Sequence, residues 1–366
     1  MALRGITWDH PRGYRALDAI AAGTGDIVWS RQALAGFEET PLDELAEEFD
    51  LLVIDHPNLG AAGATTRLLP LDDASLGIAP LLAELSAQSV GRSFDSYRAD
   101  GGLWALPLDA ATQVTVRTPG SASPPDDWAG VVEHARAVPT ALCLGGPHAF
   151  LMLAALCAGE GRPLVDADGD LDLDVIDERL ELMARLLDLA DEQASTLTPI
   201  RLLDLMASGR GPQYCPLVYG YVSYQDGPRP VLRVGDAPLG TVSRGSVLGG
   251  TGLAISSRTP DRDAAVAAAA RLLSPSGQRA TYPREGGQSA RLDVWTDPAQ
   301  NALVNGFYAD TLATMRDAWV RPRAAWYPAL QRIGSDLVRE GLIERRPARR
   351  IRQELERRHD EARETA

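Results

Sequence analysis

Two short stretches of the sequence place an aspartate and a histidine directly ahead of a proline. Asp9 and His10 follow one strand-like apolar run, and Asp55 and His56 end another. A carboxylate can orient an imidazole as an acid or base near neutral pH, and both groups can hydrogen-bond the hydroxyls or carboxylate of a ligand. Each aspartate could equally cap the following turn while the histidine packs against its neighbours. The pattern leaves these three interpretations open.

Two aspartates and two histidines could also hold a divalent metal ion. No cysteine and no H-x-x-x-H spacing accompanies them, so we expect no metal and no other cofactor. The cysteines Cys143, Cys157 and Cys215 are far apart and show no C-x-x-C spacing. We expect them to be buried, reduced thiols.

Both Asp-His pairs come at the ends of predicted strands within an alternating strand-helix pattern. The expected strands are 4–8, 26–32 and 50–55, and the expected helices are 13–25 and 40–49. Such alternation predicts an open α/β sheet, in which ligands bind beyond the carboxyl ends of the strands. We therefore expect the two pairs to line one crevice.

The rest of the chain continues with mixed elements. Apolar residues recur at helical spacing in some segments, and strand-like alternation returns in others. The expected elements are an extended run over 103–116, helices over 123–138, 145–161 and 171–193, a strand over 209–225, a strand, turn and helix over 249–278, and a helical final 60 residues.

Composition limits the classes of partner and chemistry. A chain of 366 residues predicts two domains or lobes. A net charge of −14 argues against nucleic acid or an anionic membrane surface as a partner. All 36 basic residues are arginine, which excludes an imine-forming or P-loop lysine. No apolar run reaches the roughly 18 residues of a membrane span, so we expect no membrane insertion.

Aromatic and basic side chains are further candidates for a ligand site. Trp8, Trp104 and Trp326 could stack on the apolar faces of sugar rings, although a tryptophan in a strand more often belongs to the core. Arg12 and Arg284 could bind a carboxylate, sulfonate or phosphate by bidentate contacts. Among so many arginines, any one is more often a surface residue.

The order of the motifs resembles the extracellular solute-binding proteins of family 1, the sugar-binding subunits of ABC importers, which are maltose-binding-protein-like. The stretch "YRADGGLWALPLDAATQVTV" is similar to the family's first crossing strand, and "PPDDWAGVVEHAR" to its Pro- and Trp-containing helix start. "RLLDLMASGRGPQYCPL" and "GGTGLAISSRTPDRDAAVAAAARLLSPSGQ" resemble a following segment and the return strand and helix. The resemblance implies the periplasmic-binding-protein type II fold, with two α/β lobes joined by crossing strands and closing on a solute in the cleft.

On this resemblance we expect each lobe to be discontinuous in sequence. The N-terminal lobe would contain residues 1–110 and about 248–295, and the C-terminal lobe 111–247 and about 296–366.

Four further side chains would then reach the cleft. Asp109 and Gln113 fall at the crossing between the lobes, where both lobes could reach a ligand. Tyr219 and Tyr221 would face one side of the strand expected over 209–225 and could place a polar tip in the cleft.

The leading interpretation is a solute-binding protein of an ABC-type importer that captures a small polar solute, a carbohydrate or sugar acid, by hinge closure. We expect a monomer, with an ABC permease as a candidate partner. The alternative is a cytoplasmic enzyme on the same scaffold, an isomerase, dehydratase or cyclase with His10 or His56 as base and Asp9 and Asp55 orienting them. A cytosolic sensor is a third, weaker interpretation.

The expected location depends on the start of the chain. The sequence as written has no signal peptide, which predicts a cytoplasmic protein. A leader removed before Met1 would instead place the protein in the periplasm or outside the cell.

Overall fold

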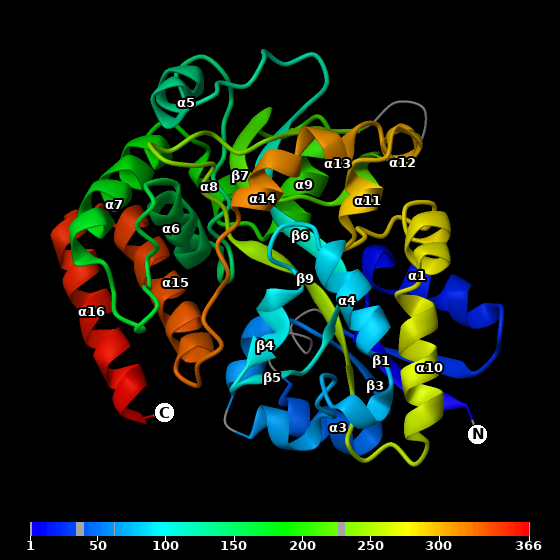
Figure 1. Cartoon of the computed structure of the whole chain (residues 1–366). Coiled ribbons are helices and arrows are strands. Elements are labelled where there is room, and N and C mark those ends of the chain that lie inside the picture. Colours follow the sequence, from blue (N-terminus) through cyan, green and yellow to red (C-terminus); the bar gives the residue numbers. More distant parts are fainter. Residues whose placement is uncertain (1, 34–39, 62, 226–230, 366) are drawn as a thin grey trace.

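The computed structural model of the chain describes residues 2–33, 40–61, 63–225 and 231–365. Helices lie in two groups to either side of a long, mixed sheet, which gives the molecule two lobes side by side (Figure 1). No helix of the described residues is both long and apolar enough to cross a membrane.

The strands form one mixed sheet and a separate short hairpin. In chain order they are β1 (Leu3–Trp8), β2 (Ile27–Gln32), β3 (Leu51–Ile54), β4 (Arg98–Ala99), β5 (Gly102–Leu103), β6 (Leu106–Arg117), β7 (Tyr214–Tyr219), β8 (Arg233–Gly235) and β9 (Leu248–Ile255). The sheet order is β2-β1-β3-β9-β6-β7, with β8 paired to β6, and β4 and β5 make the hairpin. Strand β1 runs parallel to β2 and β3, whereas β9 is antiparallel to both β3 and β6.

Strand β6 belongs to both lobes. Its residues from Leu106 to Thr112 pair with β9, and its residues from Gln113 to Arg117 pair with β7 and β8. Every residue of β6 except the last is buried, including the polar residues Asp109, Thr112, Gln113 and Thr115. The strand therefore carries the chain from one lobe to the other.

Among the helices of the first lobe, the first and the last begin at a side-chain cap. His10 precedes the first of them, and its ring accepts a hydrogen bond from the backbone N–H of Arg12. Asp261 caps the last by accepting from the backbone N–H of Ala264 at 3.0 Å. The helices are α1 (Pro11–Ala22), α3 (Leu42–Glu48), α4 (Ala79–Ala87) and α10 (Arg262–Leu272), with a short 3-10 helix η1 (His56–Gly60) after β3.

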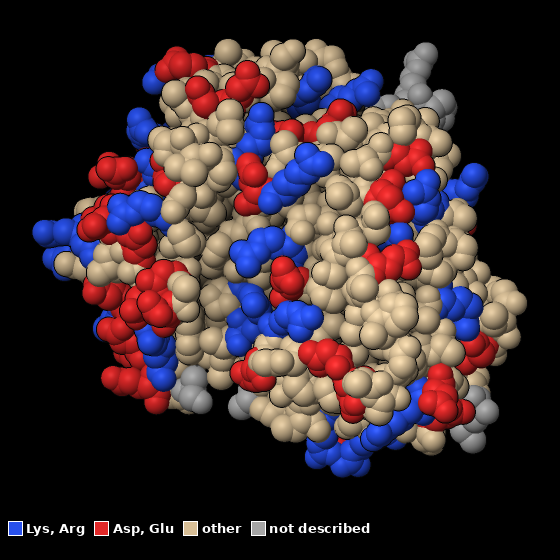
Figure 2. All heavy atoms as spheres, viewed as in Figure 1, with Lys and Arg blue, Asp and Glu red and all other residues tan. Residues whose placement is uncertain are grey.

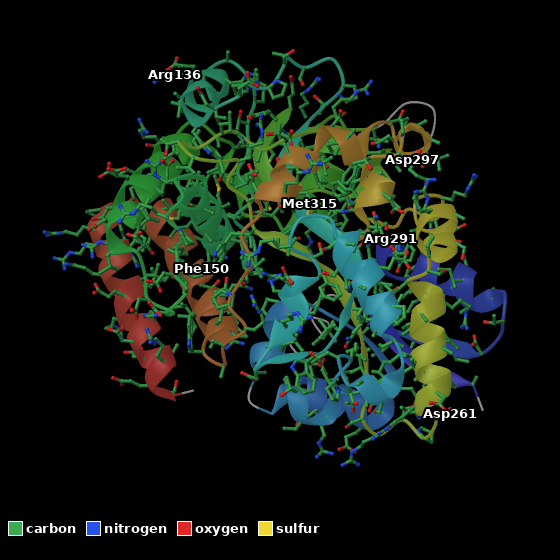
Figure 3. The ribbon with its side chains drawn as sticks, viewed as in Figure 1. Arg136, Phe150, Asp261, Arg291, Asp297 and Met315 are labelled. Atoms are coloured by element: carbon green, nitrogen blue, oxygen red, sulfur yellow. The ribbon has the colours of Figure 1, made fainter. Side chains whose placement is uncertain are left out.

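The second lobe is built around one almost wholly buried helix. Its helices are α5 (Trp128–Ala135), α6 (His148–Gly159), α7 (Leu173–Leu187), α8 (Glu192–Ser195), α9 (Pro199–Ala207), α15 (Tyr327–Ile343) and α16 (Ala348–Thr365). Helix α6 is apolar on all sides and packs against α7 and α15. Phe150 of α6 lies among these helices and meets Tyr327 edge-on at 6.2 Å (Figure 3).

Four short helices form a separate small core beside β6. They are α11 (Leu292–Trp295), α12 (Pro298–Leu303), α13 (Phe307–Asp310) and α14 (Leu312–Asp317). Trp295, Phe307 and Tyr308 pack against one another there, with ring centroids 5.2 to 6.3 Å apart. This core is distinct from the main one.

Most of the predicted elements are confirmed, and one is wrong. The strand expected over 209–225 ends at Tyr219, after which Gly220 leads into a 3-10 helix over Val222–Gln225. The tyrosines at 219 and 221 therefore do not alternate along one strand. An added Cβ at Gly220 would lie 3.0 Å from Val114 and 3.1 Å from Phe307, so this close approach favours glycine.

The chain between α14 and α15, the crossing segment (residues 319–326), is extended and packs closely on η1 of the first lobe. A Cβ added to Gly60 would lie 2.5 Å from the backbone nitrogen of Ala324 and 2.6 Å from the carbonyl carbon of Arg323. Both are backbone atoms, so neither can move out of the way cheaply. The absence of a side chain at residue 60 is therefore what lets the two segments touch.

Gly60→Ala should lower the free energy of unfolding by about 1–3 kcal/mol, because overpacking a close contact forces the backbone to shift. The matched control is Gly235→Ala, where an added Cβ meets nothing within 4 Å. The control should change stability by less than about 0.5 kcal/mol. Urea denaturation measures both, and equal stability of the two variants would contradict the close contact at Gly60.

Candidate functional site

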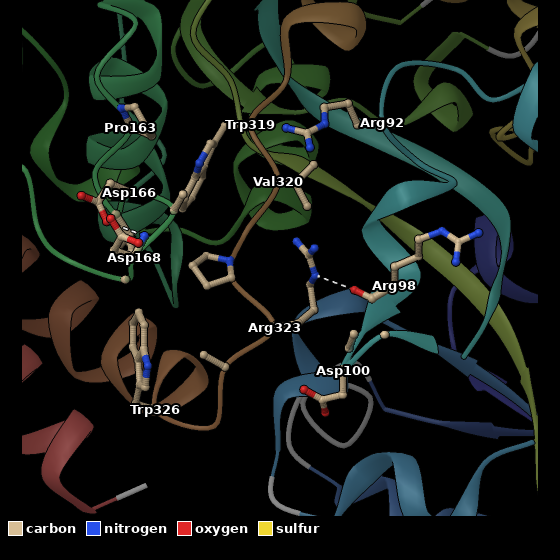
Figure 4. A pocket seen from close by; sticks show the side chains of 17 residues that line it. Arg92, Arg98, Asp100, Pro163, Asp166, Asp168, Trp319, Val320, Arg323 and Trp326 are labelled. Atoms are coloured by element: carbon tan, nitrogen blue, oxygen red, sulfur yellow. Dashed lines mark hydrogen bonds between the residues drawn. The ribbon is translucent and has the colours of Figure 1, made fainter. Parts of the chain in front are cut away.

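A cavity of about 720 Å³ opens between the lobes, and both lobes line it (Figure 4). The first lobe contributes Arg92 and the turn of residues 98–101, and the second contributes residues from the loop 163–169. Residues of the crossing segment 319–326 form its floor. A volume of this size suits a small molecule, since ligand sites usually enclose about 300–1,000 Å³.

Two tryptophans lie on the floor of the cavity and are held in place. Trp319 and Trp326 are both half-buried and both line the cavity. Tyr327 meets both rings edge-on, at 6.5 and 5.9 Å. The backbone of Trp319 also exchanges hydrogen bonds of 2.8 Å with Ser246 and Leu248. The rings are therefore fixed platforms on which a flat apolar face could stack.

The second Asp-His pair is bound to an arginine of the crossing segment. Arg321 donates from Nη2 to both carboxylate oxygens of Asp55, each at 2.8 Å. Asp55 also accepts from the backbone N–H of His56 at 2.9 Å. Burial favours the neutral acid, but the charge of Arg321 together with the hydrogen bonds from His56 and Arg321 outweighs it and lowers the pKa of Asp55 to about 2. Asp55 is therefore a fixed negative charge that holds Arg321 in place.

Three buried polar atoms around this pair make no hydrogen bond within the described part of the chain. They are Nε2 of His56, Nε of Arg321 and the hydroxyl of Tyr327. Buried polar atoms are nearly always paired, because leaving one without a partner is costly. Arg321 sits between Val320 and Pro322, both of which line the cavity. His56, Arg321 and Tyr327 themselves do not line the cavity, so a buried water is the simplest partner for these three atoms.

Burial keeps the neighbouring histidines neutral. Desolvation, followed by the charge of Arg321, lowers the pKa of His56 to about 4 and that of His148 to about 3. His148 meets Tyr219 edge-on at 5.6 Å, and Tyr97 meets His56 at 6.2 Å. The surroundings of Arg321 thus combine one buried ion pair with neutral hydrogen-bonding rings.

The first Asp-His pair belongs to a different cluster, centred on Arg12. The guanidinium of Arg12 is buried and donates from Nε to Asp109 at 3.0 Å and from Nη2 to the other carboxylate oxygen. Its Nη1 reaches the carbonyl of Gly220 at 3.5 Å. It also lies over the rings of Tyr221 and Trp8, at 5.1 and 5.8 Å from their centroids. Arg12 therefore ties α1 to strand β6 and to the loop that follows β7.

His10 completes this cluster, while Asp9 does not. The ring of His10 stacks on Trp8 at 5.0 Å and meets Tyr221 edge-on at 5.2 Å. Burial and then the charge of Arg12 lower its pKa to about 4, so the ring is neutral at pH 7. Asp9 is exposed to solvent. The two Asp-His pairs thus follow neighbouring strands, as predicted, but each packs against its own arginine.

The remaining predicted residues are spread over other parts of the fold. Trp104 is half-buried and donates to the carbonyl of Ala99 at 2.8 Å, so it braces the β4–β5 hairpin. Gln113 is buried and accepts from the backbone N–H of Val247 at 3.3 Å. Arg284 is exposed. Of all the predicted ligand-binding residues, Trp326 alone lines the described cavity, and contact of the others with a ligand stays a prediction.

Several cavity residues were not anticipated from the sequence. They include Arg92, Arg98, Trp319 and Arg323. A signal was present for two of them, because the stretch "WVRPRAAWYP" (319–328) combines three aromatic residues, two arginines and two prolines. Arg92 and Arg98 stand in an unremarkable polar turn, where no local pattern marks them.

The described residues contain no group of three or more His, Cys, Asp or Glu that could hold a metal ion. The three cysteines are buried and free, as predicted.

No family model matches the sequence, and no curated protein matches it. Solved structures, however, match nearly the whole chain. An ABC transporter solute-binding protein of Agrobacterium radiobacter K84 in complex with ribitol aligns with a TM-score of 0.81 at 19% identity, over 100% of this chain and 99% of that one. The chain has the periplasmic-binding-protein type II fold.

Two further solved structures agree with this assignment of the fold. Maltose-bound T. maritima MalE3 aligns with a TM-score of 0.80 at 17% identity, over 98% of this chain and 99% of that one. The GacH receptor of Streptomyces glaucescens aligns with a TM-score of 0.77 at 18% identity, over 98% of both chains. Similarity at such low identity establishes the fold, and the argument for function must come from the cavity.

Arg12→Gln should lower the free energy of unfolding by about 3–5 kcal/mol, because Asp109 would remain buried without its charged partner. Arg31→Gln is the matched control, since it breaks an exposed ion pair of 2.6 Å with Asp18. The control should cost less than about 1 kcal/mol. Denaturant unfolding at neutral pH distinguishes them, and a small effect of Arg12→Gln would show that the buried pair is dispensable.

Acid should destabilise the protein between about pH 6.5 and pH 4. In this range the unfolded chain protonates its histidines, whereas His10 and His56 have pKa values lowered to about 4 in the folded state. Stability then falls with decreasing pH by up to about 1.4 kcal/mol per pH unit for each histidine. Below about pH 4 the lowered pKa of Asp55 adds a further loss, down to about pH 2.

His56→Gln should therefore flatten the dependence of unfolding free energy on pH between 6.5 and 4. Above pH 7 the unfolding free energies of the variant and the wild type should change in parallel with pH, whatever their difference in stability. His56 is then largely unprotonated in both the folded and the unfolded wild-type protein. An unchanged slope in the acid range would mean that His56 titrates normally in the folded protein.

Proposed function

We propose that this protein is a solute-binding protein of an ABC-type importer that captures a small polar solute, a carbohydrate or sugar derivative, between its lobes. The observation that carries the proposal is the cavity of about 720 Å³, lined from both lobes and floored by Trp319 and Trp326. The structural neighbours support it, because their descriptions name ribitol, maltose and acarbose as their ligands.

The side chains around the cavity suit such a solute. The C–H face of a sugar ring stacks on an aromatic ring, and Trp319 and Trp326 are held ready for this contact. Hydroxyl groups could pair with the carboxylates of Asp166 and Asp168, which line the cavity. Binding would thereby use apolar stacking for affinity and hydrogen bonds for selectivity.

Hinge closure is the proposed means of capture, with strand β6 as a connection shared by the lobes. We propose lobes of residues 1–110 with about 248–295, and of 111–247 with about 296–366. The change of partner strand within β6, between Thr112 and Gln113, supports a boundary in this part of the chain. Closure around the solute would bring the loop 163–169 toward the turn 98–101.

We also propose that the protein works as a monomer, with an ABC permease as its partner, in the periplasm or outside the cell. Two lobes of one chain complete the cavity, which supports a monomer. The neighbour described as an ABC transporter solute-binding protein supports the permease and the location.

The enzyme alternative has less support. Neither Asp-His pair lines the cavity, and His56 is only 1% exposed. A catalytic base must come within hydrogen-bonding distance of the proton that it removes. Among the described residues, no specific contact favours chemistry over binding.

Purified protein should bind sugars or polyols in a thermal-shift and calorimetry panel that includes ribitol, maltose and acarbose. A solute at about 100 times its Kd should add roughly 2.7 kcal/mol of stability. Trp326→Ala should weaken binding of any hit about tenfold or more, because it removes one stacking surface. The solute should be recovered chemically unchanged after incubation.

Trp29→Ala is the matched control, because Trp29 is also half-buried but packs over Gly5 at the far edge of the sheet. It should leave the affinity unchanged. Equal affinity in both variants would remove Trp326 from the binding site, and a solute returned altered would favour the enzyme.

A further inference from the structure

Three arginines gather on one wall of the cavity. Arg92 and Arg98 come from the first lobe and Arg323 from the crossing segment, and all three line the cavity. Figure 4 shows the guanidinium of Arg323 in the middle of the opening with that of Arg92 turned toward the same space, whereas the guanidinium of Arg98 points away from both. In the space-filling view, blue side chains gather along the groove between the lobes (Figure 2).

Two of these charges have no acidic partner in the described part of the chain. Arg323 donates to backbone carbonyls, from Nε to Arg98 at 3.2 Å and from Nη1 to Arg321 at 3.0 Å. Arg92 makes no ion pair there. Arg98 has only a long contact of 3.4 Å with Asp72, which does not line the cavity. Carbonyl oxygens orient the guanidinium of Arg323 but leave its positive charge uncompensated.

The arginines also repel one another. Burial and then the charge of Arg92 lower the pKa of Arg323, and the negative charge of Asp95 opposes this only in part. Like charges in a partly desolvated cleft are unfavourable until an anion enters between them. An anionic group placed there would be bound by charge-assisted hydrogen bonds, which are roughly twice as strong as neutral ones.

The opposite wall has a different chemistry. Asp166 and Asp168 lie there, on the loop from the second lobe (Figure 4). One carboxylate oxygen of Asp166 accepts two backbone N–H groups of its own loop, from Asp168 and Asp170, each at 2.9 Å. This fixes the carboxylate in place. Carboxylates accept hydrogen bonds from hydroxyl groups and repel anions. The two walls would therefore bind different parts of one molecule, an anionic group at the arginines and hydroxyl groups at the aspartates.

Building on the proposed function, we propose that the solute is an anionic sugar derivative, a sugar acid or sugar phosphate. Its acidic group would lie between Arg92 and Arg323, its ring or chain against the tryptophans, and its hydroxyls toward Asp166 and Asp168. The protein as a whole has a net charge of −14 and repels anions at long range. Attraction must therefore come from the arginine wall at short range.

The test is calorimetry of the wild-type protein with neutral sugars and polyols and the anions derived from them. The pairs are ribitol with ribitol 5-phosphate, and D-glucose with D-gluconate, D-glucuronate and D-glucose 6-phosphate, and inorganic phosphate is tested alone. At least one anionic derivative should bind about tenfold or more tightly than its neutral parent. Its affinity should fall as the salt concentration rises.

The variants Arg323→Gln and Arg92→Gln should each weaken binding of that anion by about tenfold or more, while the affinity for the neutral parent changes by less than about threefold. Arg323→Lys should retain part of the affinity. Arg92→Gln is the cleaner variant, because the side chain of Arg92 is exposed and has no hydrogen bond in the described structure to lose. Arg136→Gln is the matched control, since Arg136 is exposed just after the end of α5, away from the cavity (Figure 3), and its loss should leave affinity unchanged.

The possible outcomes separate the two proposals. Tighter binding of a neutral sugar, or equal affinity of the wild type and the arginine variants, would overturn the anion inference and leave a sugar-binding protein. Inorganic phosphate that binds as tightly as a sugar phosphate would overturn a sugar-derived solute. If no member of the panel binds, both proposals fail.

Discussion

The ion pair of Arg321 with Asp55 is the contact on which the arrangement of the cavity depends. Asp55 stands at the end of a buried strand of the first lobe, and Arg321 lies in the segment that floors the cavity. A guanidinium this deeply buried is stable only with a carboxylate beside it. The pair therefore anchors the segment 319–326 to the first lobe. It thereby sets the positions of Trp319 and Arg323, which lie two residues to either side of Arg321.

The lobes are connected in two physically different ways. Strand β6 joins them through a continuous backbone, whose hydrogen bonds to β9 and to β7 hold each half in its own sheet region. Arg12 and Arg321 join them through side chains, which can reorganise at the cost of breaking charged hydrogen bonds. Under the proposed hinge motion, bending would concentrate where β6 changes partner, and the arginine contacts would favour the closed arrangement. A solute then needs to bind the closed form better than the open one by the free energy that separates them.

The sequence was a good guide to the elements and a poor guide to what surrounds each site residue. The apolar runs before Asp9 and Asp55 end where the strands end, because strand formation depends on local patterns. The partner of Asp55, in contrast, lies 266 residues further along the chain, and no local pattern connects the two. Tyr221 shows the same limit: one glycine ends β7 and turns this residue toward Arg12 instead of along the strand. Which charges face the open cavity is decided by packing over the whole chain.

The placement of the aromatic residues also has an optical consequence. Two of the seven tryptophans, Trp319 and Trp326, line the cavity, and Tyr327 touches both. The fluorescence of an indole ring depends on the polarity and mobility of its surroundings, so a solute that displaces water from these rings changes part of the emission of the protein. The molecule thus carries its own unlabelled reporter of occupancy, and stopped-flow mixing could follow capture and release in real time on the native chain.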